Sequence, residues 1–411
     1  RKQKVSVKLV VEVEEYIAKE YRHHRTREKI HSKFPEDVGH LEVNYDESVE
    51  AFAMYLHSVA NVPYNKVQEI LREETDGLLN VSVGKLANME KKFQSMTDEE
   101  RQAIGRELLA GKYMNIDGTM IRSNGKQRQV LVMRNKEAVL YKMTGCKGDK
   151  AVEGTPAEHY QGTVVCDSEA AFVKLGSRRQ GCIIHEERYL VRAMENTPDI
   201  TWHKDMHDLL IEVNNRKKND VAAGKKSMKP ADQEEVRNRW DEIVNRGIRE
   251  YMAILPGVSE STFYDKDEKQ NMLVDKDKDV APKARQGQFL LPDGLDLTKD
   301  INLLKRLRLK RDEYLLFLND YSLPNHNNDA EKSARSVKIH MKPNGGMRSD
   351  DYVGHYADTT SVLETERLKG KSRFKKIKEV FGRKTAIARK AMQEAHGRRK
   401  TNYSEPSCAG I

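Results

Sequence analysis

The feature that most constrains the fold of this chain is an abrupt change in its hydrophobic pattern near residue 111. Beyond it lie five short apolar runs, whereas the flanking stretches are charged and have helical spacing. The runs cover residues 113–117, 129–134, 138–144, 162–167 and 181–185. Asn124-Gly125 separates two of the first three runs, as in antiparallel strands joined by a tight turn. The pattern predicts an α/β fold with helices on the faces of a mixed sheet.

Residues 47–95 have the apolar spacing of helices, with Ser82 placed to cap the last of them. Two helices joined by a short turn that contains Gly are typical of a helix-turn-helix. Its second helix would turn Lys85, Asn88 and Lys92 outward, towards DNA phosphates and base edges. An ordinary helical hairpin has the same pattern, so both interpretations stay open at this point.

The remaining segments are less regular. Residues 5–13 alternate and are rich in valine, which predicts a strand. Residues 186–255 are long, charged and helical, and residues 256–300 form a predicted surface loop with Gly, Pro and dense Asp and Lys. Helix is expected again at residues 301–318 and from residue 328.

Charge is unevenly distributed along the 411 residues. The whole chain carries +9, whereas residues 367–400 alone hold 14 Lys and Arg against 2 Asp and Glu, a net of +12. Such a basic segment favours a polyanionic partner, because bound phosphates release counterions. The four cysteines lie far apart and form no disulfide framework, which favours a cytoplasmic protein. No apolar run is long enough for a membrane span. The chain begins at Arg1, so we expect an upstream segment to be missing.

Two aspartates, Asp117 and Asp167, close predicted strands. Open α/β sheets bind ligands at the carboxyl ends of their strands. Asp is also a common turn and capping residue, so each one taken singly is better explained that way. A third carboxylate, Glu331, is four residues from Arg335 and shares a helix face with it, which is the usual spacing of a surface salt bridge.

Asn327 and Asn328 precede Glu331 and favour a helix start with a contact role. Three carboxylates that converge from two strands and a helix would hold two Mg²⁺ ions, which support in-line phosphodiester chemistry. Cys182 and His185 form a lone Cys-x-x-His, at best half a zinc site. We expect Cys182 to pack in the core and His185 to point towards the carboxylates.

Several motifs in this order resemble the DDE transposases of the insertion sequence 66 (IS66) family. The clearest is LPNHNNDAEKSARSVKIHMK at residues 323–342, followed by SVLETERLKG at 361–370. VVCDSEAAF, GCIIHEERYL and NIDGT are similar to the family's second-Asp, Cys-x-x-His and first-Asp motifs. Residues 62–93 resemble the family's helix-turn-helix.

The resemblance implies a ribonuclease-H-like core with Asp117, Asp167 and Glu331 as catalytic, metal-binding residues for two Mg²⁺ or Mn²⁺ ions. It implies cleavage and strand transfer on double-stranded DNA, a homo-oligomer on DNA, accessory proteins from the same element and a nucleoid-associated protein. His185, Cys182, Asn327, Asn328 and Arg335 would assist, and Arg373, Lys375 and Lys376 would contact the DNA backbone. The expected units are residues 1–38, 39–108 (helix-turn-helix), 109–190 (core), 191–300 (helical insertion), 301–385 (core) and 386–411 (basic tail).

The chain departs from the family pattern in places. No Cys-x-x-Cys zinc ribbon precedes the helix-turn-helix, and His23, His24 and His31 lie in a segment expected to be solvated rather than metal-binding. Gly118 follows the first Asp where the family has Glu, and Lys332 replaces an Arg. Two alternatives therefore stay open: a catalytically silent DNA-binding remnant, and a metal-dependent nuclease without strand transfer.

Overall fold

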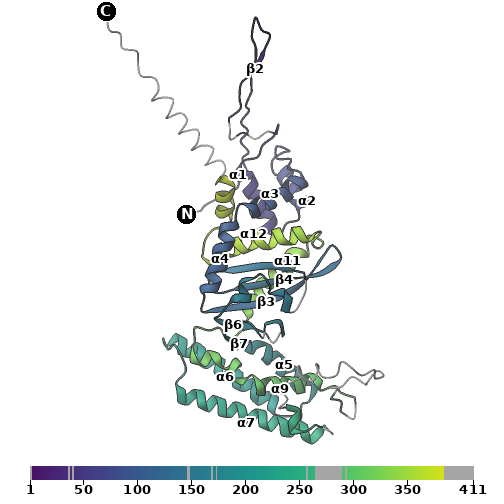
Figure 1. Cartoon of the computed structure of the whole chain (residues 1–411), viewed down its shortest axis with the longest axis vertical. Coiled ribbons are helices and arrows are strands. Elements are labelled where there is room, and N and C mark those ends of the chain that lie inside the picture. The colour runs from purple at the N-terminus through teal and green to yellow at the C-terminus, as the bar shows by residue number, and fades with distance from the viewer. Residues whose placement is uncertain are drawn as a thin grey trace, which may run out of the picture.

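The computed structural model describes residues 2–35, 38, 41–145, 149–167, 170–172, 174–255, 258–263, 289–291 and 294–383. Figure 1 shows an elongated molecule with a β-sheet in the middle. A hairpin and the helices α1 to α3 lie at one end, and the helices α5 to α7 and α9 lie at the other. The expected α/β class with a mixed sheet is confirmed. The basic tail at 386–411 and most of the loop at 256–300 lie outside the described residues.

The N-terminal region is a small hairpin of β1 (Glu20–Arg22) and β2 (Lys29–His31), whose side chains are exposed. The strand predicted at residues 5–13 is wrong, because that segment pairs with no strand among the described residues and all of its side chains except Val11 are exposed. Alternation alone does not make a strand where no sheet buries one of its faces.

Helices follow, as predicted for residues 47–95, and a further helix, α4, comes after them. They are α1 (Glu47–Met54), a π-helical turn (Tyr55–Val59), α2 (Tyr64–Glu73), α3 (Val83–Ser95) and α4 (Asp98–Ala110). Ser82 caps α3 as expected, since its hydroxyl accepts a hydrogen bond from the Lys85 N–H at 3.2 Å. Val67, Leu71, Leu86 and Phe93 are buried between these helices.

The sheet contains five strands in the order β5-β4-β3-β6-β7. They are β3 (Tyr113–Ser123), β4 (Lys126–Arg134), β5 (Val139–Thr144), β6 (Thr163–Cys166) and β7 (Arg178–Gly181). The first three form an antiparallel meander, and β6 and β7 run parallel to β3. Asn124 and Gly125, with φ of 47° and 74°, make the predicted tight turn between β3 and β4.

Different helices cover the two faces of the sheet. One face packs Met114, Ile116 and Leu131 against α1, α3 and α4. The other packs Ile121 and Val132 against α11 (Asn328–Met341) and the start of α12 (Asp350–Leu368). A further helical segment spans 373–383.

Helix α12 also covers the outer edge of the sheet. The Ser361 and Thr365 hydroxyls accept hydrogen bonds from the β5 N–H groups of Tyr141 and Val139, at 2.8 and 3.1 Å. This edge is therefore closed to pairing with another chain.

A second body is built from helices alone, with its own apolar core. It comprises α5 (Ile183–Asn196), α6 (Trp202–Ala222), α7 (Pro230–Ile254), α9 (Thr298–Leu309) and α10 (Arg311–Tyr314). Apolar residues of 297–323 contribute to this core, so the helical body extends past the boundary expected at residue 300. Among the described residues, no helix is both long and apolar enough to cross a bilayer.

Short 3-10 turns connect these elements. They lie at Asp149–Ala151, Pro156–His159, Ala170–Phe172, Glu260–Phe263 and Leu316–Asn319.

Candidate functional site

The two aspartates lie on neighbouring strands. Parallel pairing matches Asn115 of β3 with Val165 of β6, and the same register continued by two residues would put Asp167 beside Asp117. Asp167 follows β6 directly, as expected. Asp117 lies within β3 and not at its end, which corrects the prediction, because β3 continues in pairing with β4 as far as Ser123.

The start of α11 is fastened over this part of β3. Asn327 is buried; its side-chain amide donates to the Ile116 carbonyl at 2.8 Å and accepts from the Asn115 side chain at 2.9 Å. Asp117 is two residues beyond Asn115, so both side chains emerge on the sheet face that α11 covers. Asn328 is the first residue of α11 and is half-buried. Asn327 therefore positions α11 on β3. The residues next to Asn327 in the sequence do not predict this contact, because β3 is more than two hundred residues away.

Cys182 and His185 lie at the start of α5. The strand predicted at 181–185 is wrong beyond Gly181, because Cys182 is the N-cap of α5 and the isoleucines that follow turn towards the helical body. The Cys182 N–H donates to the Cys166 carbonyl at 3.1 Å, which sets Cys182 beside the end of β6. Its sulfur accepts a hydrogen bond from the Asn327 N–H at 3.2 Å. Burial raises the pKa of the Cys182 thiol to about 11.

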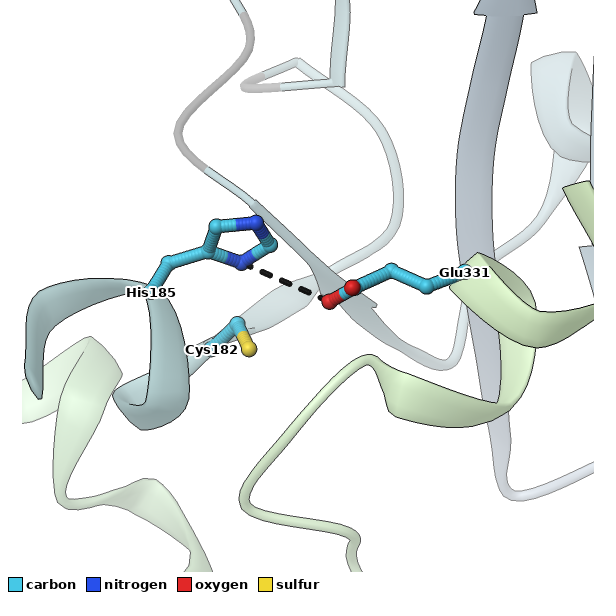
Figure 2. Close-up of side chains that lie close together, drawn as sticks. All are labelled: Cys182, His185 and Glu331. Carbon is cyan, nitrogen blue, oxygen red and sulfur yellow. Dashed lines mark ion pairs between the residues drawn. The ribbon is translucent and has the colours of Figure 1, made fainter. Parts of the chain in front are cut away.

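Glu331 reaches from the first turn of α11 towards α5 (Figure 2). Its Oε1 lies 3.7 Å from His185 Nδ1, and its Oε2 lies 3.7 Å from an Arg188 guanidinium nitrogen. Arg335 is exposed and pairs with no acidic group among the described residues, so the surface salt bridge that its spacing from Glu331 would allow does not form. His185 does point towards Glu331, as predicted. Cys182, His185 and Glu331 offer ligand atoms that all lie within 4.8 Å of one another.

Helix ends and buried charges support this arrangement. Glu331 lies near the N-termini of both α11 and α5, where the helix dipoles favour negative charge. Glu186, the residue after His185, is buried and accepts hydrogen bonds from Arg306 and from the Tyr314 hydroxyl, each at 2.7 Å. These contacts hold α5 against α9 and α10, and thus orient His185.

The sequence missed two residues here, Arg188 and Glu186. Arg188 could have been found, because it is three residues from His185 and therefore shares its helix face. Glu186 could not, since its partners Arg306 and Tyr314 are more than a hundred residues away in the chain.

The predicted DNA contacts of α3 divide into two groups. Asn88 is exposed and Lys85 is half-buried. Lys92 points back into the fold, where its Nζ lies 2.6 Å from the buried Glu50 carboxylate and 5.0 Å from the Phe381 ring centre. Lys92 is therefore engaged inside the molecule and does not face outward as expected.

The same holds for part of the C-terminal basic segment. Arg373 pairs with Glu364 at 2.7 Å, and Lys376 pairs with Glu100 at 3.2 Å and Glu379 at 3.0 Å. Lys375 alone of the three predicted residues is exposed. Arg373 and Lys376 thus fasten residues 373–383 to α12 and α4. At the other end of the chain, His23, His24 and His31 belong to no group of three metal-ligating residues among those described.

Fold and site together define a mixed α/β protein in which Cys182, His185 and Glu331 meet at the starts of two helices, whereas Asp117, Asp167 and Glu331 form no group with ligand atoms within 4.8 Å among the described residues. The family model described as Transposase IS66 family matches residues 42–273, which is more than half of the chain. The chain belongs to this transposase family, and its role lies in DNA transposition. No curated protein matches the chain. The matched range includes Asp117, Asp167, Cys182 and His185 and ends before Glu331.

Proposed function

We propose that this chain is a DDE transposase that cuts DNA at transposon ends and joins those ends to a target, with Asp117, Asp167 and Glu331 as its catalytic carboxylates. One observation carries the proposal. The parallel pairing of β3 with β6, continued by two residues, would bring the two aspartates together on the face covered by the helix that bears Glu331. The contacts of Asn327 with β3 support this, because they hold the start of the Glu331 helix over the strand that carries Asp117.

A ribonuclease-H-like core is part of the proposal. Its support is the topology, a three-stranded antiparallel meander followed by two strands parallel to the first. The helical body of α5 to α10 would be an insertion between the second and third carboxylates. In such a core the meander holds the first Asp, and the next strand delivers the second.

The three carboxylates suit hard divalent cations, since oxygen ligands are those that Mg²⁺ and Mn²⁺ prefer. Glu331 Oε1 is buried and has no hydrogen-bond partner among the described residues, as a group kept for another ligand would be. Two such ions would activate the attacking oxygen and stabilise the leaving one. Asp117, Asp167 and Glu331 would hold them in place.

Other residues would handle the DNA. Arg188 is largely exposed beside Glu331, where its guanidinium can bind a phosphate of the strand being cut. The helices α2 and α3 would act as a helix-turn-helix, with Lys85 and Asn88 towards the duplex. Lys375 would contact the backbone without reading sequence. Two transposon ends must be held together, so a homo-oligomer on DNA is expected, with accessory proteins of the same element.

The test is cleavage and joining by the full chain on a labelled duplex of the element's own end, with Mg²⁺ or Mn²⁺. We expect nicking and strand transfer, and a loss of at least about 10²-fold in Asp117→Asn and Asp167→Asn, because each removes a charged ligand at the reacting centre. Asp351→Asn, an exposed carboxylate on α12, is the matched control and should keep full activity.

The outcomes separate the alternatives. Binding without nicking would identify a DNA-binding remnant, and nicking without joining would identify a nuclease. Equal activity in Asp117→Asn and the control would overturn the assignment of the carboxylates.

A further inference from the structure

Two of the three residues grouped in Figure 2 are not ligands that magnesium prefers. Cys182 Sγ, a His185 ring nitrogen and a Glu331 oxygen lie within 4.8 Å of one another. Thiolate and imidazole are ligands of zinc-type transition metals, whereas Mg²⁺ selects oxygen. The cluster could therefore bind a transition-metal ion, and it shares Glu331 with the proposed magnesium site.

The spacing of the ligand atoms fits one tetrahedral ion. Bonds of about 2.0 Å to nitrogen or oxygen and about 2.3 Å to sulfur place neighbouring ligand atoms about 3.3 to 3.6 Å apart around zinc. His185 Nδ1 and Glu331 Oε1 are already 3.7 Å apart. Cys182 and His185 are the N-cap and third residue of α5, so both side chains face the start of α11. Small rotations of these side chains would complete the geometry.

The polar atoms in the cluster lack the partners that buried groups normally have. Neither His185 Nδ1 nor Glu331 Oε1 has a hydrogen-bond partner among the described residues, although both atoms are buried. Their separation of 3.7 Å is too long for a hydrogen bond between them. Buried polar atoms left this way in a native fold call for a ligand.

The surroundings also suit a bound ion. The Asn327 N–H donates to Cys182 Sγ at 3.2 Å, a contact of the kind that stabilises thiolate ligands of metals. The His185 and Glu331 side chains keep 22% and 17% of their exposure, so an ion can enter from solvent. Three protein ligands leave one coordination position open, as in exchangeable rather than purely structural zinc sites.

We propose that Cys182, His185 and Glu331 together bind one divalent transition-metal ion of the zinc type, and that this ion competes with magnesium for Glu331. The competition rests on the proposed function, whereas the metal site does not. Occupation would withdraw Glu331 from Asp117 and Asp167, so zinc would act as an inhibitor of the enzyme.

Binding is tested first, by titrating the full chain with Co²⁺ in the absence of Mg²⁺ and DNA. We expect one equivalent to produce the near-ultraviolet thiolate-to-cobalt absorption and the visible bands of a tetrahedral ion, which Zn²⁺ then abolishes. Cys182→Ser should lose the thiolate absorption, and His185→Ala and Glu331→Gln should weaken binding at least about tenfold. Cys166→Ser, which changes another buried cysteine, should keep the wild-type spectrum.

A wild-type chain without thiolate absorption, or a Cys182→Ser chain that retains it, would overturn the site. Circular dichroism of each variant shows that it is folded before the titration is interpreted.

Competition is tested second, by adding Zn²⁺ to the Mg²⁺-dependent cleavage reaction. We expect inhibition that excess Mg²⁺ relieves, and an inhibitory Zn²⁺ concentration at least tenfold higher for the remaining activity of Cys182→Ser. Equal sensitivity of the two proteins would refute the competition. If the chain cleaves no DNA at all, the proposed function fails, while the cobalt titration still decides the metal site.

Discussion

The two ends of α11 contrast in how they treat buried polar groups. At its N-terminal end, Glu331 and His185 face each other at 3.7 Å with buried atoms that lack hydrogen-bond partners among the described residues. At its C-terminal end, His340 is also buried, yet both of its ring nitrogens have partners, Asn61 at 3.0 Å and the Tyr352 hydroxyl at 2.9 Å. One helix thus holds a cluster with unmet bonding capacity and another whose capacity is filled.

The C-terminal cluster joins the N-terminal helices to the core. His57 of the π-helical turn contacts Tyr352 of α12 at 2.8 Å and stacks on Tyr64 with ring centres 3.7 Å apart. The Tyr64 hydroxyl donates to the buried Glu90 carboxylate of α3 at 2.8 Å. Segments widely separated in the sequence therefore meet at α11.

The Tyr352 hydroxyl lies between the two histidines and links them by hydrogen bonds. His57 Nδ1 donates to the Val62 carbonyl at 2.8 Å, so its Nε2 is left to accept from the Tyr352 hydroxyl. The Tyr352 oxygen can then accept from His340 Nε2, and His340 Nδ1 lies 3.0 Å from Asn61 Oδ1, which is also an acceptor. A neutral His340 ring has one N–H and can therefore donate to only one of these two oxygens. Burial lowers the pKa of both histidines, which favours their neutral forms.

The contrast suggests a criterion that separates a ligand-binding site from a structural cluster on the same helix: whether the buried polar atoms have hydrogen-bond partners. Filled hydrogen-bonding capacity, as around Tyr352, stabilises the fold and fixes where α11 lies. Unfilled capacity, as at Glu331, lowers stability and is retained where a ligand will bind. Substitutions at the two ends should therefore affect different measurements.

The largest expected effect is on catalysis at the N-terminal end. Glu331→Gln should lower the cleavage rate by about 10²-fold or more, since it removes a charged ligand. It should change the free energy of unfolding by less than about 1 kcal/mol, because its ion pairs are long and partly exposed. Single-turnover cleavage and urea denaturation measure the two quantities, with Asp351→Asn as control. A loss of several kcal/mol in the free energy of unfolding would show that Glu331 has a structural role, and the two ends of α11 would then not differ in function.

The next effect is on stability at the other end. Tyr352→Phe removes the hydroxyl that links two histidines, which leaves two buried nitrogens without a partner and should cost about 2–4 kcal/mol. The cleavage rate per folded molecule should stay unchanged. Tyr189→Phe, an exposed tyrosine of α5, is the matched control and should shift stability by no more than about 0.5 kcal/mol. Urea denaturation of both variants checks this, and equal stabilities would contradict a stabilising role of the Tyr352 hydroxyl.

The smallest effect is a pH dependence. Burial lowers the pKa of His340 to about 3 and that of His57 to about 4, from 6.5. Below pH 6.5 the unfolded chain therefore binds a proton at His340 that the folded chain does not bind. The contribution of His340 to the free energy of unfolding is complete above pH 6.5 and is lost as the pH falls towards 3. The loss is about 1.4 kcal/mol per pH unit.

Glu90 has the opposite effect on the pH dependence of stability, because burial raises its pKa from 4.5 to about 7. Its contribution to the free energy of unfolding therefore falls as the pH rises from 4.5 to 7. Comparing wild type with His340→Gln at each pH removes the Glu90 contribution. The stability advantage of wild type should shrink by about 1.4 kcal/mol per unit between pH 6.5 and 4.5 in urea denaturation. A constant advantage would mean that His340 is not held neutral.

Much of the architecture was predictable because it is encoded locally. Apolar spacing predicted the helices of residues 47–95, Ser82 was recognised as a cap, and Asn124-Gly125 as the turn between β3 and β4. The helix start at Asn328 followed from its two asparagines. Each of these depends on residues within one or two turns of chain.

Errors arose where a distant partner decides the outcome. Residues 5–13 alternate like a strand but meet no sheet, and Gly181–His185 is cut short because Cys182 begins a helix. Lys92 was expected outward, yet the buried Glu50 draws it in. Glu331 was matched with Arg335 on its own helix, whereas α5 supplies its neighbours.

By itself, the sequence determined which residue types were present for chemistry: two aspartates after apolar runs, and a glutamate after paired asparagines. Only the tertiary structure decided which of them share a place. β3 and β6 pair in parallel just before the two aspartates, and Asn327 fastens the start of α11 to β3. Sequence encodes local propensity over a few residues, whereas register and helix docking depend on burial between segments that meet only after folding.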